Sequence, residues 1–503
     1  MKKTSVAILS GVAVAVAAVV IGGAWYTGKR LPGELDHALA LSNAQLQKSL
    51  VNTGGSVRIE LVSLDQRWFS STAHYRVVAR DVRASSQQVM NFDVGVTDQI
   101  EHGPFPWSRV KTLRLLPVLA LSNTTLDKDD VTAPWYAAAG DRVPFSAQTS
   151  MGYGGSVDSQ VRLAPVKLDD ANGTSLAFSG MELGVSGDRD GKDSRFHGEA
   201  DHFLMKLVSE DQPPVIFELN GLKLGGKLAA TAHDNLFTGN ADLYLAETKV
   251  TLGPRQQALV IKGGELSTLQ SLEGPDTFGG RVEYKLGDIT WDGRAVGKAQ
   301  MIVGFKSIHA PALQALSNWY AVHLPEFEAA AAAGQSAPQI NMTEAEKAKF
   351  QGDLRTLLAA KPKVALEDLS LKTANGESHF NLAMDFDAPS SFDLPQDQAL
   401  KQMVTQVTSK LSLSKPMLGD LATLQALLDG QTDAQAIAMQ SGQAGEMVGL
   451  MAVQSGLATV DGDKVISSLH YADGMVDFNG QKMTLEAFAA FVNTRLAMLS
   501  PQR

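Results

Sequence analysis

Apolar and polar side chains alternate with a period of two over much of the chain between residues 56 and 307. The clearest stretches are Val57–Leu61, Tyr75–Ala79 and Val282–Leu286. Because successive side chains of a β-strand point to opposite faces of its sheet, each stretch predicts a strand with one face in water and the other against a core.

Asn-Gly and Asp-Gly pairs separate these stretches. Glycine and asparagine accept the positive φ angles of tight hairpin turns, so the pairs predict that consecutive strands are joined as antiparallel hairpins. We therefore expect a long meander from about Ser56 to Ser307, without the alternation of strand and long helix that is typical of a parallel nucleotide-binding sheet. The pairs begin at residues 172, 190, 220, 292, 375, 461, 473 and 479.

Apolar residues at helical spacing are frequent in the C-terminal part of the chain. A helical pattern starts at Pro311 and leads to Pro325 and an alanine tract, after which we expect a linker. Thr343 and Glu346 form a capping-box pattern that predicts a helix to about residue 360. Further helices are expected within 396–455 and at 484–499, and further strands at 364–371, 378–386, 465–471 and 475–478.

These patterns together predict an α+β protein: a long antiparallel β-meander, forming an extended curved sheet, with C-terminal helices and one N-terminal transmembrane helix. We expect residues 1–28 to form the membrane anchor. Residues 29–310 are expected to hold a juxtamembrane helix, at about 34–50, and the antiparallel β region. Residues 311–503 are expected to complete the sheet with mixed helices and strands.

The anchor is predicted from an uncharged apolar run, Val6–Tyr26. As a helix with about 1.5 Å per residue it would extend roughly 31 Å, close to the hydrocarbon thickness of a bilayer. A cleaved secretory signal ending near Gly22 or Ala24 is the alternative, but the apolar core of a signal peptide normally has only about 7–15 residues. The basic residues on each side slightly favour a cytoplasmic N-terminus, with the bulk of the chain outside the cytoplasm.

Composition narrows the classes of function. The chain has 503 residues, of which 44% are hydrophobic, so it can bury a sizeable core. Its net charge of −10 argues against a dedicated nucleic-acid binder, which needs a surplus of cations to displace phosphate counterions. The absence of cysteine excludes disulfides, thiolate metal sites and cysteine nucleophiles.

Motifs that carry chemistry are incomplete. Gly221, Gly226 and Lys227 occupy three positions of a phosphate-binding loop, but Leu228 stands where a magnesium-binding Ser or Thr is required. A hairpin with a glycine bulge is the better interpretation of this segment. The Gly-x-Ser-x-Gly and His-Glu-x-x-His patterns are both absent from the sequence, so we expect no catalytic residue and no cofactor site of these kinds.

Two clusters of potential metal ligands are also weak. His197, Glu199 and Asp201 would share one face of a strand with His202 on the other, which is typical of a solvated face. The aspartates around Gly191 lack the glycine and glutamate spacing of a calcium loop. We expect no metal site.

Methionines recur at helical spacing in the predicted 396–455 region. Met439, Met447, Leu450 and Met451 would line one stripe of a helix. Core packing is the expected role of this stripe, and an adaptable partner groove is the alternative.

Five segments, spread in order along the chain, resemble the YdgA family, envelope proteins of Gram-negative bacteria classed under a domain of unknown function. The longest is the C-terminal Tyr471–Met483, and Glu101–Pro106 matches the family's Asp-His-Gly-Pro-Phe-Pro signature with Glu at its first position. The resemblance implies an inner-membrane, single-pass protein with its bulk in the periplasm, and it supplies no catalytic residues. The segments are Gly22–Arg30, Glu101–Pro106, Ala177–Gly180, Asp188–Lys192 and Tyr471–Met483.

The segment His102–Trp107 combines two prolines with two large aromatic side chains. Prolines fix φ and bias the preceding residues to extended conformations, so we expect a rigid corner anchored by Phe105 and Trp107. The alternative is a partner-docking loop in which His102, Phe105 and Trp107 form exposed anchors.

We therefore expect a non-enzymatic envelope protein whose β-sheet serves as a binding surface for another envelope protein or for an elongated apolar ligand such as a lipid. The pattern leaves open whether helices at 343–360 and 396–455 cover the apolar face. An unrecognised envelope hydrolase that uses His102 or His197 is a less favoured alternative, and a homo-oligomeric assembly factor is a third.

Overall fold

The computed structural model describes residues 39–40, 42–44, 46–47, 55–85, 88–188, 191–209, 212–233, 236–335, 338 and 340–499. The chain divides into two compact units, residues 1–256 and 257–503. The predicted membrane helix at 6–26 lies outside the described residues. Within the described ranges, no helix combines the length and the apolar character needed to cross a bilayer.

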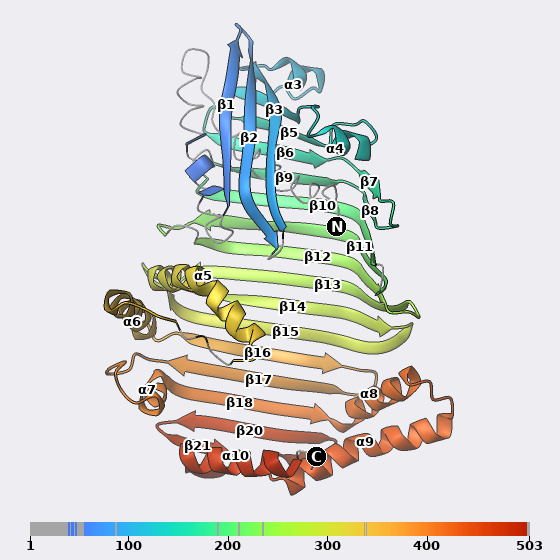
Figure 1. Ribbon diagram of the computed structural model, residues 1–503, viewed down its shortest axis with the longest axis vertical. Coiled ribbons are helices and arrows are strands. Elements are labelled where there is room, and N and C mark those ends of the chain that lie inside the picture. The colour runs from blue at the N-terminus through green and yellow to red at the C-terminus, as the bar shows by residue number, and fades with distance from the viewer. Residues whose placement is uncertain are drawn as a thin grey trace. The chain divides into compact units, whose positions relative to one another are not determined.

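The first unit is an antiparallel sheet (Figure 1). Its strands pair in the order β1–β2–β3–β4–β5–β6–β9–β10–β11–β12, and the short β7–β8 hairpin joins β10 through β8. The meander predicted from the sequence is therefore confirmed here, with one inserted hairpin. The strands are β1 (Ser56–Gln66), β2 (Ser70–Ser85), β3 (Gln88–His102), β4 (Ala120–Leu126), β5 (Phe145–Met151), β6 (Ser156–Leu163), β7 (Val166–Asp169), β8 (Ser175–Phe178), β9 (Met181–Asp188), β10 (Asp193–Ser209), β11 (Gln212–Ala230) and β12 (Phe237–Leu252).

A closed hydrophobic core lies between the first strands of this unit. Alternate side chains of β1, β2 and β3 pack against those of β4, β5 and β6, and Val77 and Val94 are completely buried. The short helix α4 (Ala133–Ala138) adds Trp135 and Tyr136 to the same core. The predicted alternation thus gives a dry face wherever the chain folds over its own sheet.

Most predicted turns are confirmed, with one clear exception. The pairs at 172, 292, 375, 461, 473 and 479 lie at turns between paired strands, whereas Asp190 lies outside the described residues. Asn220–Gly221 is not a turn, and the predicted hairpin around the phosphate-loop-like glycines is wrong. Gly221 instead lies within the continuous strand β11, with φ of 63°. Strand register is unchanged on either side of this residue, because Asn220 and Leu222 are both paired with β10 and with β12.

The second unit is also an antiparallel sheet. Its strands pair in the order β13–β14–β15–β16–β17–β18–β20–β21–β22, and β19 pairs with β20. The strands are β13 (Gln257–Leu272), β14 (Thr277–Trp291), β15 (Arg294–His309), β16 (Lys363–Lys372), β17 (Glu377–Phe386), β18 (Val404–Ser414), β19 (Thr459–Asp461), β20 (Lys464–Ala472), β21 (Met475–Phe478) and β22 (Gln481–Thr484). Both units therefore confirm an α+β protein built on antiparallel strands.

Helices of the second unit follow the sequence prediction with two corrections. The capping box is present, because Thr343 Oγ1 accepts from the Glu346 amide and the Glu346 carboxylate accepts from the Thr343 amide. The first helix continues through Pro325 to Ala332. The predicted helical region 396–455 is interrupted by β18, in which valines and leucines alternate with polar residues. The helices are α5 (Ala310–Ala332), α6 (Glu344–Ala359), α7 (Gln396–Met403), α8 (Lys415–Leu428), α9 (Ala434–Gln454) and α10 (Leu485–Leu499).

The methionine stripe on α9 points outward, so the expectation of core packing is wrong. Met439 and Met447 are exposed, and so are their neighbours Leu450 and Met451. The helix packs through small residues instead. A Cβ at Gly445 would lie 2.5 Å from the Lys415 carbonyl oxygen, so only glycine permits this close approach.

The irregularity at Gly221 gives a stability prediction. We expect Gly221→Ala to lower the free energy of unfolding by about 1–2 kcal/mol, because an L-residue is disfavoured in the left-handed region and a Cβ would lie 2.7 Å from that of Ala246. Denaturant unfolding measures the effect. The matched control is Gly225→Ala in the same strand, where the new Cβ meets only the Phe196 carbonyl oxygen at 3.5 Å. Equal stability of the two variants would contradict the prediction.

Candidate functional site

Apolar side chains form continuous rows across the strands of the second unit. One row crosses six strands, because strand register places Tyr284 opposite Met301, Met301 opposite Leu369, and so on along the sheet. We call it the central apolar row. With about 4.8 Å between neighbouring strands, it extends roughly 24 Å. The row consists of Leu266, Tyr284, Met301, Leu369, Phe380 and Leu411.

Parallel rows widen this surface on both sides. Leu286, Ala299 and Leu371 lie opposite one another on one side of the central apolar row. On the other side, a second row runs from β14 to β17 and consists of Val282, Val303, Leu366 and Leu382. The three rows together form a face that is apolar both across the strands and along them.

This face is only partly covered. Tyr284 is 40% exposed and Leu369 is 44% exposed, and Leu286 is exposed as well. The other members of the central apolar row are half-buried. The equivalent positions in the core of the first unit are dry, so the same alternation leaves an open apolar surface here.

One margin of the face is closed by the C-terminal helix. Phe488 and Phe491 of α10 contact the ring of Phe478 with centroid distances of 5.2 and 5.9 Å. Tyr471 and Val476 are buried in the same cluster. The opposite face of the sheet is charged, as shown by the Arg281–Glu367 and Lys285–Glu283 ion pairs. The open apolar rows are therefore a specific part of one face.

A similar pattern occurs within the first unit. In β10–β12, Met205 lies opposite Phe217, which in turn lies opposite Val250, and all three are half-buried. Leu224 lies opposite Leu243 in the same pair of strands. Strands of the first unit that lie outside its closed core thus also carry half-buried apolar side chains.

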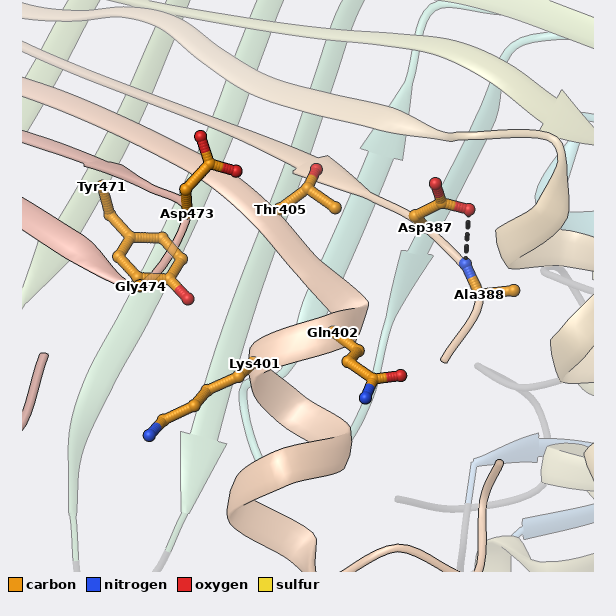
Figure 2. A pocket seen from close by; sticks show the side chains of 8 residues that line it. All are labelled: Asp387, Ala388, Lys401, Gln402, Thr405, Tyr471, Asp473 and Gly474. Carbon is orange, nitrogen blue, oxygen red and sulfur yellow. Dashed lines mark hydrogen bonds between the residues drawn. The ribbon is translucent and has the colours of Figure 1, made fainter. Parts of the chain in front are cut away.

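A polar recess of about 340 Å³ lies beside α7 in the second unit (Figure 2). Two of its charged groups have partners, since Asp387 pairs with Lys361 at 3.3 Å and Lys401 pairs with Glu486. The hydrogen bond from Lys401 lowers the pKa of Glu486 to about 2. The recess includes Tyr471 and Asp473, from the segment that carries the longest family resemblance, but it presents no arrangement suited to acid and base catalysis. It is lined by Asp387, Ala388, Lys401, Gln402, Thr405, Tyr471, Asp473 and Gly474.

The predicted corner at His102–Trp107 is present. His102 Nε2 lies 3.0 Å from Ser71 Oγ, and the His102 amide donates to the Phe69 carbonyl at 2.9 Å. Phe105 is 58% exposed and Trp107 is 64% exposed. The expectation that these aromatic rings anchor the corner in a core is therefore wrong, and the partner-docking loop stays a prediction.

Sequence reasoning missed the neighbouring hairpin tip. Trp68 and Phe69 form the turn between β1 and β2, closed by a 2.8 Å bond from the Arg67 amide to the Ser70 carbonyl, and they are 93% and 81% exposed. Two adjacent aromatics at a tight turn are unusual, because such turns favour small polar residues. Two aromatic residues at the turn between two alternating segments are therefore the feature of the sequence that could have indicated this exposed site.

The other candidate ligands and bases do not converge. His197, Glu199 and Asp201 lie along the exposed face of β10, and His202 Nδ1 lies 2.7 Å from Asn220 Oδ1. No group of three or more His, Asp or Glu side chains in the described part of the chain could hold a metal ion. Ser71 beside His102 is buried, whereas His102 itself is half-buried.

Asp98 is a buried carboxyl in the core of the first unit. Ser122 Oγ donates to it at 2.7 Å, and burial raises its pKa to about 6. The buried hydroxyl of Tyr75 has no hydrogen-bond partner, and its pKa is raised by burial and by the charge of Asp98. Because Asp98 is almost fully enclosed, this perturbed carboxyl is structural and has no access to a substrate.

Asp98 should make stability depend on pH. The folded state holds its proton more tightly than the unfolded state, whose usual pKa is 3.8, so the free energy of unfolding falls as pH rises from about 4 to about 6. A difference of about two units corresponds to roughly 3 kcal/mol. We expect Asp98→Asn to reduce this fall, as measured by denaturant unfolding across that range.

The control for this experiment is Asp158→Asn, which changes an exposed carboxyl of β6. Asp158→Asn should leave the pH dependence close to that of the wild type. An Asp98→Asn variant with the same fall in stability as the wild type would contradict the assignment.

Comparisons with known proteins agree with the predicted resemblance. A family described as "Bacterial protein of unknown function (DUF945)" matches residues 1–486. The chain is 28% identical to Protein YdgA of Escherichia coli (strain K12) over 492 residues, which cover 97% of this chain and 96% of that protein. It is 23% identical to the Uncharacterized protein YihF of the same organism over 507 residues, covering 95% and 97%. No solved structure matches the chain.

Proposed function

This chain belongs to the DUF945 family of bacterial proteins of unknown function, so its family assigns it no activity. We propose from its structure that it binds an elongated apolar ligand. The ligand class is the acyl chain of a lipid. The binding surface is the open apolar face of β13–β18. In this proposal the protein is a non-enzymatic component of the bacterial envelope, held at the inner membrane by its N-terminal segment with its bulk in the periplasm.

The observation that supports this proposal is the exposure of the central apolar row. Tyr284 and Leu369 are large apolar side chains that face water in the middle of a sheet, where a folded chain normally covers them. Burying a fully exposed side chain of this kind is worth about 1.5–3 kcal/mol, so covering the 40% of Tyr284 and 44% of Leu369 that are exposed gains roughly 1 kcal/mol each. We propose an extended rather than a compact ligand because each row is long and narrow and crosses several successive strands.

The dimensions of the row suit an acyl chain. It extends roughly 24 Å, and the acyl chains of one leaflet occupy about half of the 30 Å hydrocarbon core of a bilayer. The row consists of apolar side chains from six strands, without a charged member. A single chain lying across the strands would therefore contact apolar atoms along its whole length.

We expect a double variant, Tyr284→Asp with Leu369→Asp, to weaken binding of a fluorescent long-chain fatty acid at least about tenfold, because ligand contact would desolvate the new charges. Fluorescence titration of the full chain measures the affinity. Both side chains are exposed, so their replacement should leave the β content unchanged by circular dichroism.

The matched control is Leu269→Asp. Leu269 is an exposed leucine of β13 that lies three residues after Leu266, so its side chain points to the opposite face of the sheet. Its substitution therefore adds a charge to the face that lacks the central apolar row. This variant should bind the fatty acid like the wild type. Equal loss in all variants, or no loss in the double variant, would contradict the assignment of the ligand to the central apolar row.

A further inference from the structure

Exposed aromatic and aliphatic side chains gather at one end of the first strands. We call this set the tip surface. The bond from the His102 amide to the Phe69 carbonyl brings the β1–β2 turn against the end of β3, and Figure 1 shows α3 (Trp107–Lys111) beside these strand ends. The tip surface consists of Trp68, Phe69, Phe105, Trp107, Leu115 and Leu116, all of which are exposed.

Cations accompany these side chains. The connection between β3 and β4, residues 103–119, contains Arg109, Lys111 and Arg114 and no acidic residue, in a chain with a net charge of −10. Lys111 Nζ lies 5.5 Å from the centre of the Trp107 ring. Arg67 adds a further cation beside Trp68 in the β1–β2 turn. The tip surface is thus locally basic as well as apolar.

Glu101, the acidic residue at the end of β3, is already hydrogen-bonded. Glu101 accepts a hydrogen bond from the Ser108 amide at 2.8 Å and another from the Ser108 hydroxyl. These bonds hold the start of α3 against the strand. The carboxylate therefore supports the loop that carries Trp107.

Backbone strain in this loop lowers the stability of the protein, in addition to the exposure of its aromatic side chains. Leu113 has a φ of 57°, in the left-handed region that a branched side chain disfavours, and it is exposed too. Exposed tryptophans and a strained leucine lower the stability of the isolated protein, and such features are typical of a surface that acts on a partner.

We propose that the tip surface docks onto the surface of an anionic lipid bilayer. Tryptophan, other large apolar residues and adjacent Lys or Arg form the composition that partitions into a membrane interface, with rings at headgroup level and cations on lipid phosphates. The positive charge of residues 103–119 complements anionic headgroups. This inference concerns the first unit and does not depend on acyl-chain binding by the second.

The opposite end of β4 provides an internal comparison. There the β4–β5 connection, residues 127–144, contains two basic and four acidic residues, so its net charge is −2. It also exposes an apolar side chain, Val131. The seven residues of β4 put the two connections about 23 Å apart at roughly 3.3 Å per residue. The exposed Val131 therefore lies in a net acidic connection, whereas the tip surface lies beside a basic one.

The absence of cysteine from the chain makes a direct test simple. Leu115→Cys in the full chain is labelled with an environment-sensitive fluorophore and reconstituted with vesicles of phosphatidylcholine, with and without phosphatidylglycerol. We expect a blue-shifted emission that brominated lipids quench in the anionic vesicles, and a much weaker response without phosphatidylglycerol. Adding Lys111→Gln and Arg114→Gln should reduce the response, as should high salt.

The control is Val131→Cys with the same label, which should stay in an aqueous environment in both kinds of vesicle. Full-chain reconstitution keeps any contribution of the N-terminal segment the same in both labelled proteins. A Leu115 probe that remains aqueous in anionic vesicles overturns the proposal and assigns the tip surface to a protein partner. An equal response with and without phosphatidylglycerol also overturns it, because the cations would then have no role.

Discussion

The apolar face of an antiparallel sheet must leave water, and the chain meets this constraint differently in different parts. Period-two alternation gives every long strand one apolar face. Around β1–β6, the chain folds over its own sheet and buries most of that face, including Val77 and Val94. Across β13–β18 the same alternation leaves Tyr284 and Leu369 in water. Our account of function rests on this difference, because a face that the chain leaves uncovered is available to another molecule.

Alternation and turn chemistry predict most of the fold from the sequence. The hairpins at Asp292–Gly293 and Asp473–Gly474 and the capping box at Thr343 depend on local geometry, so neighbouring residues contain the information. Asn220–Gly221 has the same local signature as a turn, but Asn220 and Leu222 pair with strands on both sides, which keeps Gly221 within β11. Strand β18 was not predicted because it lies between two helical segments. Cross-strand pairing decides both cases, and it is a non-local property.

The candidate surfaces were harder to predict than the strands that carry them. Periodicity shows which residues share a face, but coverage of that face depends on where distant helices pack. The methionines of α9 illustrate this, since glycines at 445 and 449 form the close packing face and leave Met439 and Met447 outside. His102, Phe105 and Trp107 were identified from their composition. Trp68 and Phe69 were not, because their proximity to that corner arises from pairing between β2 and β3.

Photo-crosslinking with a diazirine-bearing fatty acid tests the central claim most directly. After irradiation of the full chain, peptide mass spectrometry locates the modified residues. Our account predicts adducts in β14–β17 that follow the strand period, on Tyr284, Met301, Leu369 and Phe380, with their alternate neighbours Glu283, Gln300 and Asp368 unmodified. Adducts on both faces, or none within residues 257–414, would contradict it.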